Sequence, residues 1–254
     1  METPDESPDE RYLVPALDRG LRILALFTAE RPQWSPGDIA RATGLTRSTG
    51  FRLLHTLVVN GYLVRAGLRD LRLGPAVLAL AHGFTSGHDL IGLARPVLER
   101  LRDETGASAH LGILAGTEVL YLLRAASRQP VVSNLAAGAR LPAATTAMGR
   151  LLLAEQDEAV RLAAWTAAAG PGTWDEFRAL LHADRQAGHV AGPSGYERGL
   201  LTIAAPVRDA AGGVVAAINV SSPRALTAPE SVEPMRLAVV RAAAEISAGL
   251  GFIA

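Results

Sequence analysis

Arginine and hydroxyl side chains gather at the start of one predicted helix in the N-terminal part of the chain. Arg47 is the residue type that most often hydrogen-bonds guanine, while Ser48 and Thr49 are adaptable partners for bases or phosphates. Arg52, one turn further along, suits a phosphate, and Phe51 precedes it on the same helix. Bases in the major groove are contacted by side chains near the N-terminal end of an inserted helix. We therefore expect these five residues to contact DNA.

The segment from Trp34 to Leu73 supplies the elements that would present these side chains. Ser35 and the proline after it are typical of a helix N-cap and first turn, and Gly44 is placed to end that short helix. The DNA-contacting helix follows, and then two apolar runs flank a polar turn, which predicts a hairpin. Arg65 and Arg69 lie near that turn and suit the minor groove or the DNA backbone. This order of elements predicts a winged helix-turn-helix.

Charge is distributed unevenly along a chain that is neutral overall. Among 254 residues, 25 basic side chains balance 25 acidic ones, so the net charge does not suggest a nucleic-acid partner. The first ten residues hold five acids and no base, and we expect residues 1–10 to be a disordered acidic tail. Residues 11–73 hold ten arginines against four acids, a local excess of +6 that suits phosphate contacts.

Several classes of protein are disfavoured. The chain has no cysteine, so it has no disulfide and no thiolate metal site. Because no uncharged stretch is long enough to span a membrane, we expect a cytoplasmic protein without a membrane partner. Zinc-protease, phosphate-loop and nucleophile-elbow motifs are missing, and we expect no metal, no cofactor and no catalytic residue. An acid–base pair of His110 with Asp103 or Glu104 is the enzyme alternative, although a histidine at a strand edge is usually structural.

Gly50 conflicts with the helix around it, because glycine inside a helix costs roughly 1 kcal/mol relative to alanine. A close approach between this helix and the one before it would offset that cost. The alternative is that this glycine arose by neutral drift at a position that tolerates substitution.

The rest of the chain alternates helical and strand-like patterns. A first helix is expected at 15–28, a linker helix at 75–86, and a helix from about Asp89 that Gly106 closes. Strands are expected at 110–114, 119–123, 131–134, 200–207 and 213–221, and further helices at 145–154, 157–168, 174–186 and 229–248. This interleaving predicts a mixed α/β domain with a largely antiparallel sheet.

Six stretches of sequence are informative together. They are ALDRGLRILALF, GLTRSTGFRLLHTL, GYL and LGPAVLALA, followed by GARLPAATTAMGRLLLA from Gly138 and GLLTIAAPVRDAAGGVVAAINVSSP from Gly199. Over nearly the whole chain they resemble the IclR family of bacterial transcriptional regulators. The resemblance implies an α+β fold, with a winged helix-turn-helix domain at 11–74, a linker helix at 75–88 and a GAF-like α/β effector-binding domain at 89–254. It also implies a homo-oligomer, either a dimer or a dimer of dimers.

Polar residues in apolar strands of the second domain are candidates for ligand contacts. Asn219 and Ser221 are two apart on one strand and share a face, and Thr202 lies in the preceding strand. Thr146 begins a helix whose free N–H groups could receive an anion. In the family, the matching positions line a pocket for small organic effectors, often carboxylates. The resemblance carries over seven residues: Leu141, Thr146, Ala147, Met148, Thr202, Asn219 and Ser221.

The chain departs from the family pattern at five of these or neighbouring positions. Thr202 stands where many members have cysteine, Asn219 where many have serine, and Ala144 where histidine is frequent. Gly192 and Gly195 stand where acidic residues are common. We therefore expect the polarity of the pocket to differ from that of carboxylate-binding relatives, with room for a more apolar or bulkier ligand.

Together these features predict a sequence-specific transcriptional regulator that binds an operator in double-stranded DNA. Its expected effector is a small organic acid or an aromatic metabolite. Two alternatives stay open: a metabolite sensor with degenerate DNA binding, and a small-molecule enzyme on a GAF-like domain. The presence of Arg47, Ser48 and Arg52 disfavours the degenerate sensor.

Overall fold

The computed structural model describes residues 12–253 apart from residue 29, residues 87–88, residues 129–134 and residue 171. The expected tail at 1–10 and the expected strand at 131–134 lie outside the described residues. Contacts between residues divide the chain into two compact units, 1–87 and 88–254. Within the part of the chain that is described, no helix is long and apolar enough to cross a membrane.

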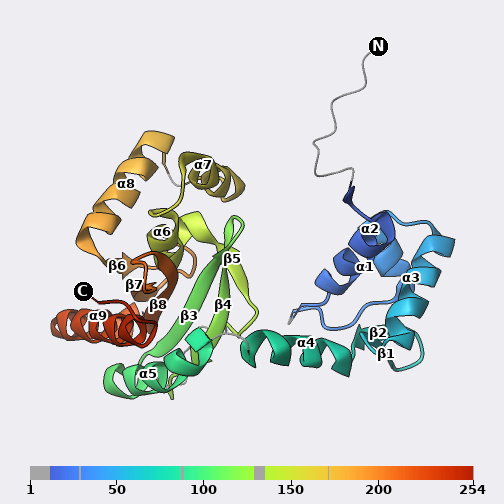
Figure 1. Cartoon of the computed structure of the whole chain (residues 1–254), viewed down its shortest axis with the longest axis horizontal. Coiled ribbons are helices and arrows are strands. Elements are labelled where there is room, and N and C mark those ends of the chain that lie inside the picture. The colour runs from blue at the N-terminus through green and yellow to red at the C-terminus, as the bar shows by residue number, and fades with distance from the viewer. Residues whose placement is uncertain (1–11, 29, 87–88, 129–134, 171, 254) are drawn as a thin grey trace, which may run out of the picture. The chain divides into compact units, whose positions relative to one another are not determined.

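The described part of the first unit comprises three helices and a hairpin, followed by the further helix α4 (Figure 1). Its elements are α1 (Pro15–Ala25), α2 (Pro36–Thr43), α3 (Arg47–Val59), β1 (Leu63–Ala66), β2 (Asp70–Leu73) and α4 (Pro75–Ser86). β1 and β2 pair antiparallel, so the expected winged helix-turn-helix is confirmed. α1 ends before the expected residue 28, because the N–H groups of Leu26 and Phe27 bond carbonyls three residues back and tighten the last turn.

Capping interactions fix the turn between α2 and α3. The hydroxyl of Ser35 accepts a hydrogen bond from the backbone N–H of Asp38 at 3.1 Å, as an N-cap does. Gly44 ends α2 with a φ of 66°, in the left-handed region. The Thr46 hydroxyl then accepts from the N–H of Thr49 at 3.4 Å and caps α3. The N-terminal end of α3 is therefore set by local sequence.

A small apolar core holds α3 and the hairpin together. Ile23, Ile39 and Leu63 are fully buried in it, and Leu54 and Leu71 are nearly so. The segment before α2 pairs with β2 through an isolated antiparallel β-bridge, in which the backbone N–H and C=O groups of Trp34 and Leu71 exchange two hydrogen bonds. The hairpin is thereby tied to the helices by backbone bonds as well as by packing.

The second unit is built on one antiparallel sheet of six strands in the order β5-β4-β3-β8-β7-β6. The strands are β3 (Ser108–Ala115), β4 (Glu118–Ala125), β5 (Arg140–Pro142), β6 (Val190–Pro193), β7 (Leu200–Arg208) and β8 (Val214–Pro223). The sequence did not predict β5 or β6. Both are short edge strands that end in proline, so they lack the apolar alternation by which strands are recognised.

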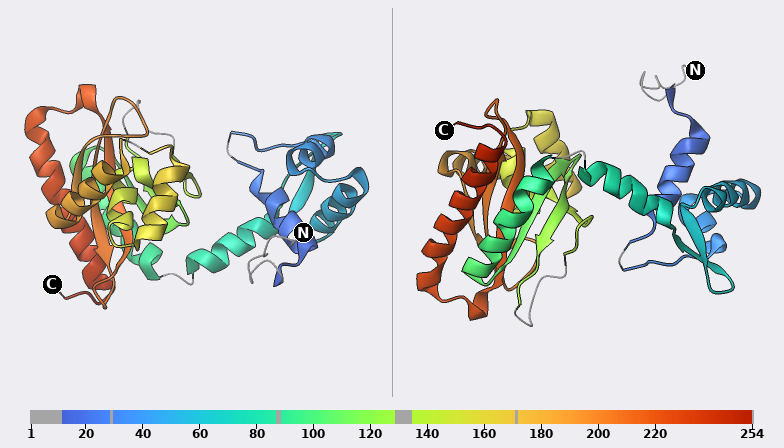
Figure 2. Two further views of the ribbon diagram at one scale, coloured as in Figure 1. Left: turned by 90° about the horizontal axis from the view of Figure 1, so that it is seen from above. Right: turned by 60° about the horizontal axis from the view of Figure 1, so that its bottom comes forward.

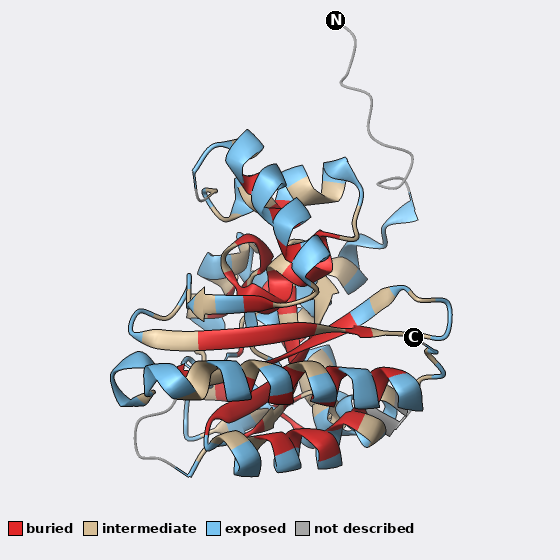
Figure 3. Cartoon of the chain, turned by 90° about the vertical axis from the view of Figure 1, so that its left-hand side faces the viewer, coloured by how far each residue is buried: buried red, intermediate tan, exposed pale blue. Residues whose placement is uncertain are grey.

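Helices cover both faces of this sheet. α5 (Asp89–Thr105) and α9 (Val232–Gly249) run side by side on one face (Figure 2), and their buried sides meet the buried central strands (Figure 3). α6 (Ala147–Leu153) lies on the other face, with α7 (Glu158–Ala167) and α8 (Trp174–Ala187) outside it. The expected GAF-like arrangement is confirmed in this α+β chain.

Candidate DNA-contacting surface and effector site

The start of α3 presents most of its predicted DNA contacts to solvent. Arg47, Ser48 and Arg52 are exposed, and Phe51 leaves 70% of its surface uncovered although it is aromatic. Thr49 differs, because it is half-buried and its hydroxyl accepts a hydrogen bond from Thr46 at 3.0 Å. Thr49 is thus partly engaged within its own turn.

A hollow of about 750 Å³ between α2, α3 and the hairpin brings helix and wing residues together. Arg47 and Phe51 line it from α3, and Arg65 and Arg69 line it from the hairpin. Ser48, Thr49 and Arg52 do not line it. Arg41 and His55 also line it, and neither was among the DNA contacts predicted from the sequence.

The arginines around this surface differ in their partners. Arg22, Arg31 and Arg41 each form an ion pair with an aspartate in α1 or α2. Among the described residues, no carboxylate forms an ion pair with the four predicted DNA-contacting arginines, Arg47, Arg52, Arg65 and Arg69. Unpaired exposed guanidinium groups are available for phosphate and base contacts.

His55 supports the exposed ring of Phe51. The two rings stack with centroids 6.3 Å apart and an interplanar angle of 11°. Their i, i+4 spacing on α3 places them on one face, and this spacing was the available sequence signal. The stacked rings of Phe51 and His55 therefore both line the hollow.

Gly50 is buried against α2, in agreement with the expectation that α2 and α3 approach each other closely at this glycine. A Cβ added there would lie 3.9 Å from the Cβ of Ala40, which is ordinary van der Waals contact. The helices are therefore close at this point, but their packing leaves room for alanine.

In the second unit, three predicted effector contacts form one hydrogen-bonded group on the sheet. The amide nitrogen of Asn219 donates to the hydroxyl of Thr202 at 3.0 Å and to that of Ser221 at 3.2 Å. Thr202 pairs with Ser221 in the register of β7 and β8. Thr202 and Asn219 are buried and Ser221 is half-buried.

His110 joins this group, and the sequence analysis did not include it. It pairs with Asn219 in the register of β3 and β8, and its Nδ1 lies 3.1 Å from Asn219 Oδ1. The interpretation of His110 as a strand-edge residue is wrong, because β3 is an interior strand between β4 and β8. Burial lowers the pKa of His110 to about 4, helped by the nearby charge of Arg124, so the ring is neutral at pH 7.

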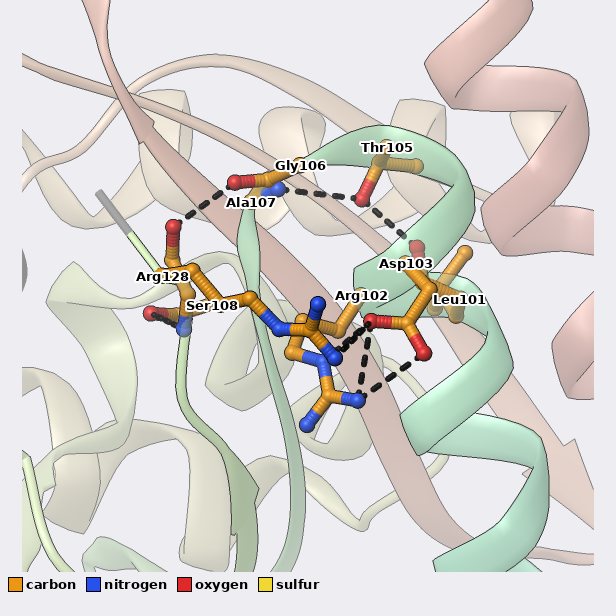
Figure 4. A network of polar contacts seen from close by, with 9 residues as sticks. Leu101, Arg102, Asp103, Thr105, Gly106, Ala107, Ser108 and Arg128 are labelled. Carbon is orange, nitrogen blue, oxygen red and sulfur yellow. Dashed lines mark hydrogen bonds and ion pairs between the residues drawn. The ribbon is translucent and has the colours of Figure 1, made fainter.

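The carboxylates proposed for acid–base work with His110 are engaged elsewhere. Asp103 forms two hydrogen bonds with the guanidinium of Arg102, both at 2.9 Å, and an ion pair with Arg128 (Figure 4). Glu104 accepts two hydrogen bonds from Arg241 on α9. The network in Figure 4 instead ties the turn between α5 and β3 to the chain after β4. It thereby anchors the start of the strand that carries His110.

Three of the four remaining predicted effector contacts belong to an apolar cluster on the α6 side of the sheet. Leu141, Ala147 and Met148 pack there with Tyr121 of β4. The Thr146 hydroxyl accepts a hydrogen bond from the N–H of Gly149 at 3.1 Å, so one of the N–H groups expected to be free is already capped. The structure thus places all seven predicted residues on one side of the sheet, but the polar and apolar members form separate groups.

Two further residues on the α6 side of the sheet are informative: one explains a departure from the family pattern, and the other was not predicted from the sequence. A Cβ on Gly195 would lie 2.4 Å from the carbonyl oxygen of Thr145, so the site has no space for an acidic side chain at that position. Tyr121, missed by the sequence analysis, packs edge-on against His110 with ring centroids 5.6 Å apart. Burial raises the pKa of Tyr121, with smaller contributions from Glu197 and Tyr196, so its hydroxyl is protonated.

Comparison with known proteins accounts for both units. Residues 16–67 match the IclR helix-turn-helix domain, and residues 82–248 match the domain described as bacterial transcriptional regulator IclR C-terminal. The second match alone spans more than half of the chain. This chain belongs to the IclR family. It is therefore a DNA-binding transcriptional regulator with a C-terminal effector-binding domain, as the sequence predicted.

The relatives of this IclR-family chain include named regulators and a solved structure, and two of them carry an aromatic compound in their name or title. The Pca regulon regulatory protein of Pseudomonas putida is 34% identical over 216 residues, which cover 82% of this chain and 74% of that protein. The p-hydroxybenzoate hydroxylase transcriptional activator of Acinetobacter baylyi is 31% identical, covering 86% and 84%. A crystal structure of an IclR homolog from Microbacterium hydrocarbonoxydans complexed with 4-hydroxybenzoate has a TM-score of 0.80 at 32% identity, covering 92% of this chain and 98% of that one.

Proposed function

We propose that α3 of this regulator enters the major groove of its operator and that the hairpin contacts the adjacent minor groove or backbone. The proposed contacts are Arg47, Ser48, Thr49, Phe51, Arg52, Arg65 and Arg69. The observation that carries this proposal is a set of four arginines, two on the helix and two on the hairpin, that form no ion pair with any carboxylate in the described part of the chain. We assign Arg47 to a guanine edge and Arg52 to a phosphate.

We further propose that the second domain binds an aromatic acid or a similar small organic acid. One relative named for p-hydroxybenzoate hydroxylase and one structure complexed with 4-hydroxybenzoate support this class of ligand. The proposed contacts are Leu141, Thr146, Ala147, Met148, Thr202, Asn219 and Ser221. The apolar cluster beside Met148 suits a ring, and the hydroxyls of Thr202 and Ser221 suit its polar substituents.

The domain organisation follows from the same proposal. The DNA-binding domain covers 11–74, the linker helix 75–88 and the effector-binding domain 89–254. We propose that the protein acts in the cytoplasm, without catalysis, as a dimer or a dimer of dimers. Exposed leucines on α1 and α4, among them Leu17, Leu21 and Leu78, support a second copy of the chain as the partner. Light scattering on the purified chain measures this state directly.

In the proposed mechanism, the effector changes the arrangement of paired winged domains and so changes their fit to the two half-sites of an operator. Thermodynamic linkage then requires that DNA change the affinity for the effector by the same factor. The effector controls transcription only to the extent that it binds the two states of the regulator differently.

The test of this function is binding of the full chain to the DNA upstream of its own gene and to random duplexes of equal length. We expect a preference of at least ~10³-fold for one upstream segment at physiological salt, with affinity falling steeply as salt rises. Equal affinity for both kinds of DNA at every salt concentration would refute sequence-specific regulation.

A further inference from the structure

One ring nitrogen of His110, which was not among the predicted effector contacts, is buried without a hydrogen-bond partner among the described residues. The side chain is fully buried and belongs to β3, which lies beside β8 in the sheet (Figure 1). Its Nδ1 meets Asn219, whereas its Nε2 is buried and has no hydrogen-bond partner among the described residues. Buried polar atoms nearly always have partners, so an unpartnered one beside the proposed effector contacts is a candidate for hydrogen bonding to the ligand.

The neighbouring hydrogen bonds determine which nitrogen of His110 carries the proton. The Thr202 hydroxyl donates its single proton to the carbonyl oxygen of Val220 at 3.2 Å, so it must accept from Asn219. The amide nitrogen of Asn219 therefore faces the two hydroxyls, and Oδ1 faces His110. Because an amide oxygen only accepts, Nδ1 of His110 is the donor.

It follows that Nε2 is a hydrogen-bond acceptor. Burial and the charge of Arg124 lower the pKa of His110 to about 4, which leaves the ring neutral near pH 7. A neutral imidazole with its proton on Nδ1 presents a bare lone pair at Nε2. A carboxylate, which also only accepts, cannot satisfy this atom. An ammonium group would be opposed by burial and by the positive charge of Arg124.

We propose that Nε2 of His110 accepts a hydrogen bond from a neutral hydroxyl group on the effector, specifically a phenolic hydroxyl. The aromatic part of this assignment rests on the apolar surroundings, in which the Tyr121 ring packs against His110 and belongs to the same cluster as Met148. The inference depends on the proposed effector site and specifies how that site distinguishes ligands. A site built to bind a hydroxyl group discriminates strongly against the analogue that lacks it.

The test uses three probes that differ at one position of the ring: 4-hydroxybenzoate, benzoate and 4-methoxybenzoate. Calorimetric titration into the full chain should give a Kd for 4-hydroxybenzoate at least ~10-fold below those of the other two, as expected for one buried hydrogen bond. In the His110→Phe variant this preference should fall below about twofold, while the Kd of benzoate changes little. His182→Gln, at an exposed histidine of α8, is the matched control and should keep the full preference.

A second measurement covers the case in which His110→Phe fails to fold. In ¹⁵N spectra of the wild-type histidines, the Nε2 resonance of His110 should shift on saturation with 4-hydroxybenzoate and stay in place with benzoate. Equal binding of the three probes, or an unmoved Nε2 resonance, would overturn the inference and leave the aromatic effector standing. If none of the three binds the wild-type chain, both the aromatic effector and this inference are wrong.

Discussion

Nδ1 of His110 and Oδ1 of Asn219 lie 3.1 Å apart across β3 and β8, inside a sheet whose neighbouring positions are mostly alanine, valine and isoleucine. Burying polar groups costs free energy unless they are hydrogen-bonded. Here the cost is offset by a series of hydrogen bonds that continues from Asn219 to Thr202 and on to the backbone carbonyl of Val220. These hydrogen bonds fix the orientations of the His110, Asn219 and Thr202 side chains.

Folding stability should depend on pH through His110. Its pKa is about 4 in the folded protein and 6.5 when unperturbed. The unfolded chain therefore takes up a proton first as pH falls, so this stabilisation is present above pH 6.5 and is lost towards pH 4. The loss is on the order of 3 kcal/mol. Urea unfolding of wild type between pH 7 and pH 4 should show this decline, and His110→Phe should show a shallower one. Parallel curves would contradict the buried neutral ring.

Arg47→Ala should weaken binding to the operator about 10–100-fold, because one arginine–guanine contact is worth about 1–3 kcal/mol of discrimination. Binding to random DNA should weaken much less. The matched control is Arg22→Ala, since Arg22 is also exposed but pairs with Asp18 on α1. Equal losses on operator and random DNA would instead assign Arg47 to a phosphate.

Phe51 should contact the methyl group of a thymine, as exposed apolar side chains do in the major groove. Replacing that thymine by uracil removes only the methyl group and should weaken wild-type binding by about 0.8 kcal/mol, roughly fourfold. Phe51→Ala should make binding insensitive to the exchange. The measurement is fluorescence anisotropy on operators with single uracils, and an unchanged wild-type affinity at every position would rule out the contact.

Two glycines of the DNA-binding domain should respond oppositely to alanine. Gly50→Ala should raise the free energy of unfolding by about 0.5–1 kcal/mol, because the new methyl group meets Ala40 at an ordinary distance. At Gly74, the added Cβ would lie 2.1 Å from the carbonyl oxygen of Gly61, so alanine should cost about 1–3 kcal/mol. Thermal unfolding compares the two, and a destabilised Gly50→Ala would show that α2 and α3 need the glycine.

The sequence predicted the DNA-binding domain well because its elements are determined locally. The Ser35 cap, the Gly44 turn and the apolar spacing of α3 each depend on residues within one or two turns. The order of helices and strands in the second domain was also predictable from apolar periodicity. β5 and β6 were not, because short edge strands gain their structure from pairing with a neighbour.

The candidate effector site was only partly predictable, for a related reason. Asn219 and Ser221 share a strand, so their common face follows from spacing alone. His110 lies 109 positions away from Asn219, and only the pairing of β3 with β8 brings them together. The partners of Asp103 and Glu104 likewise depend on tertiary packing, which left the acid–base alternative open at the level of sequence.

Ligand binding and operator binding are proposed to be coupled within one protein, and this coupling is tested by measuring both affinities. The Kd for the selected operator is determined with and without saturating 4-hydroxybenzoate, and the Kd for 4-hydroxybenzoate with and without operator. We predict a change of about 5–150-fold in the first Kd and an equal factor in the second. If 4-hydroxybenzoate binds to saturation and the operator Kd does not change, the proposed coupling between ligand and operator is contradicted.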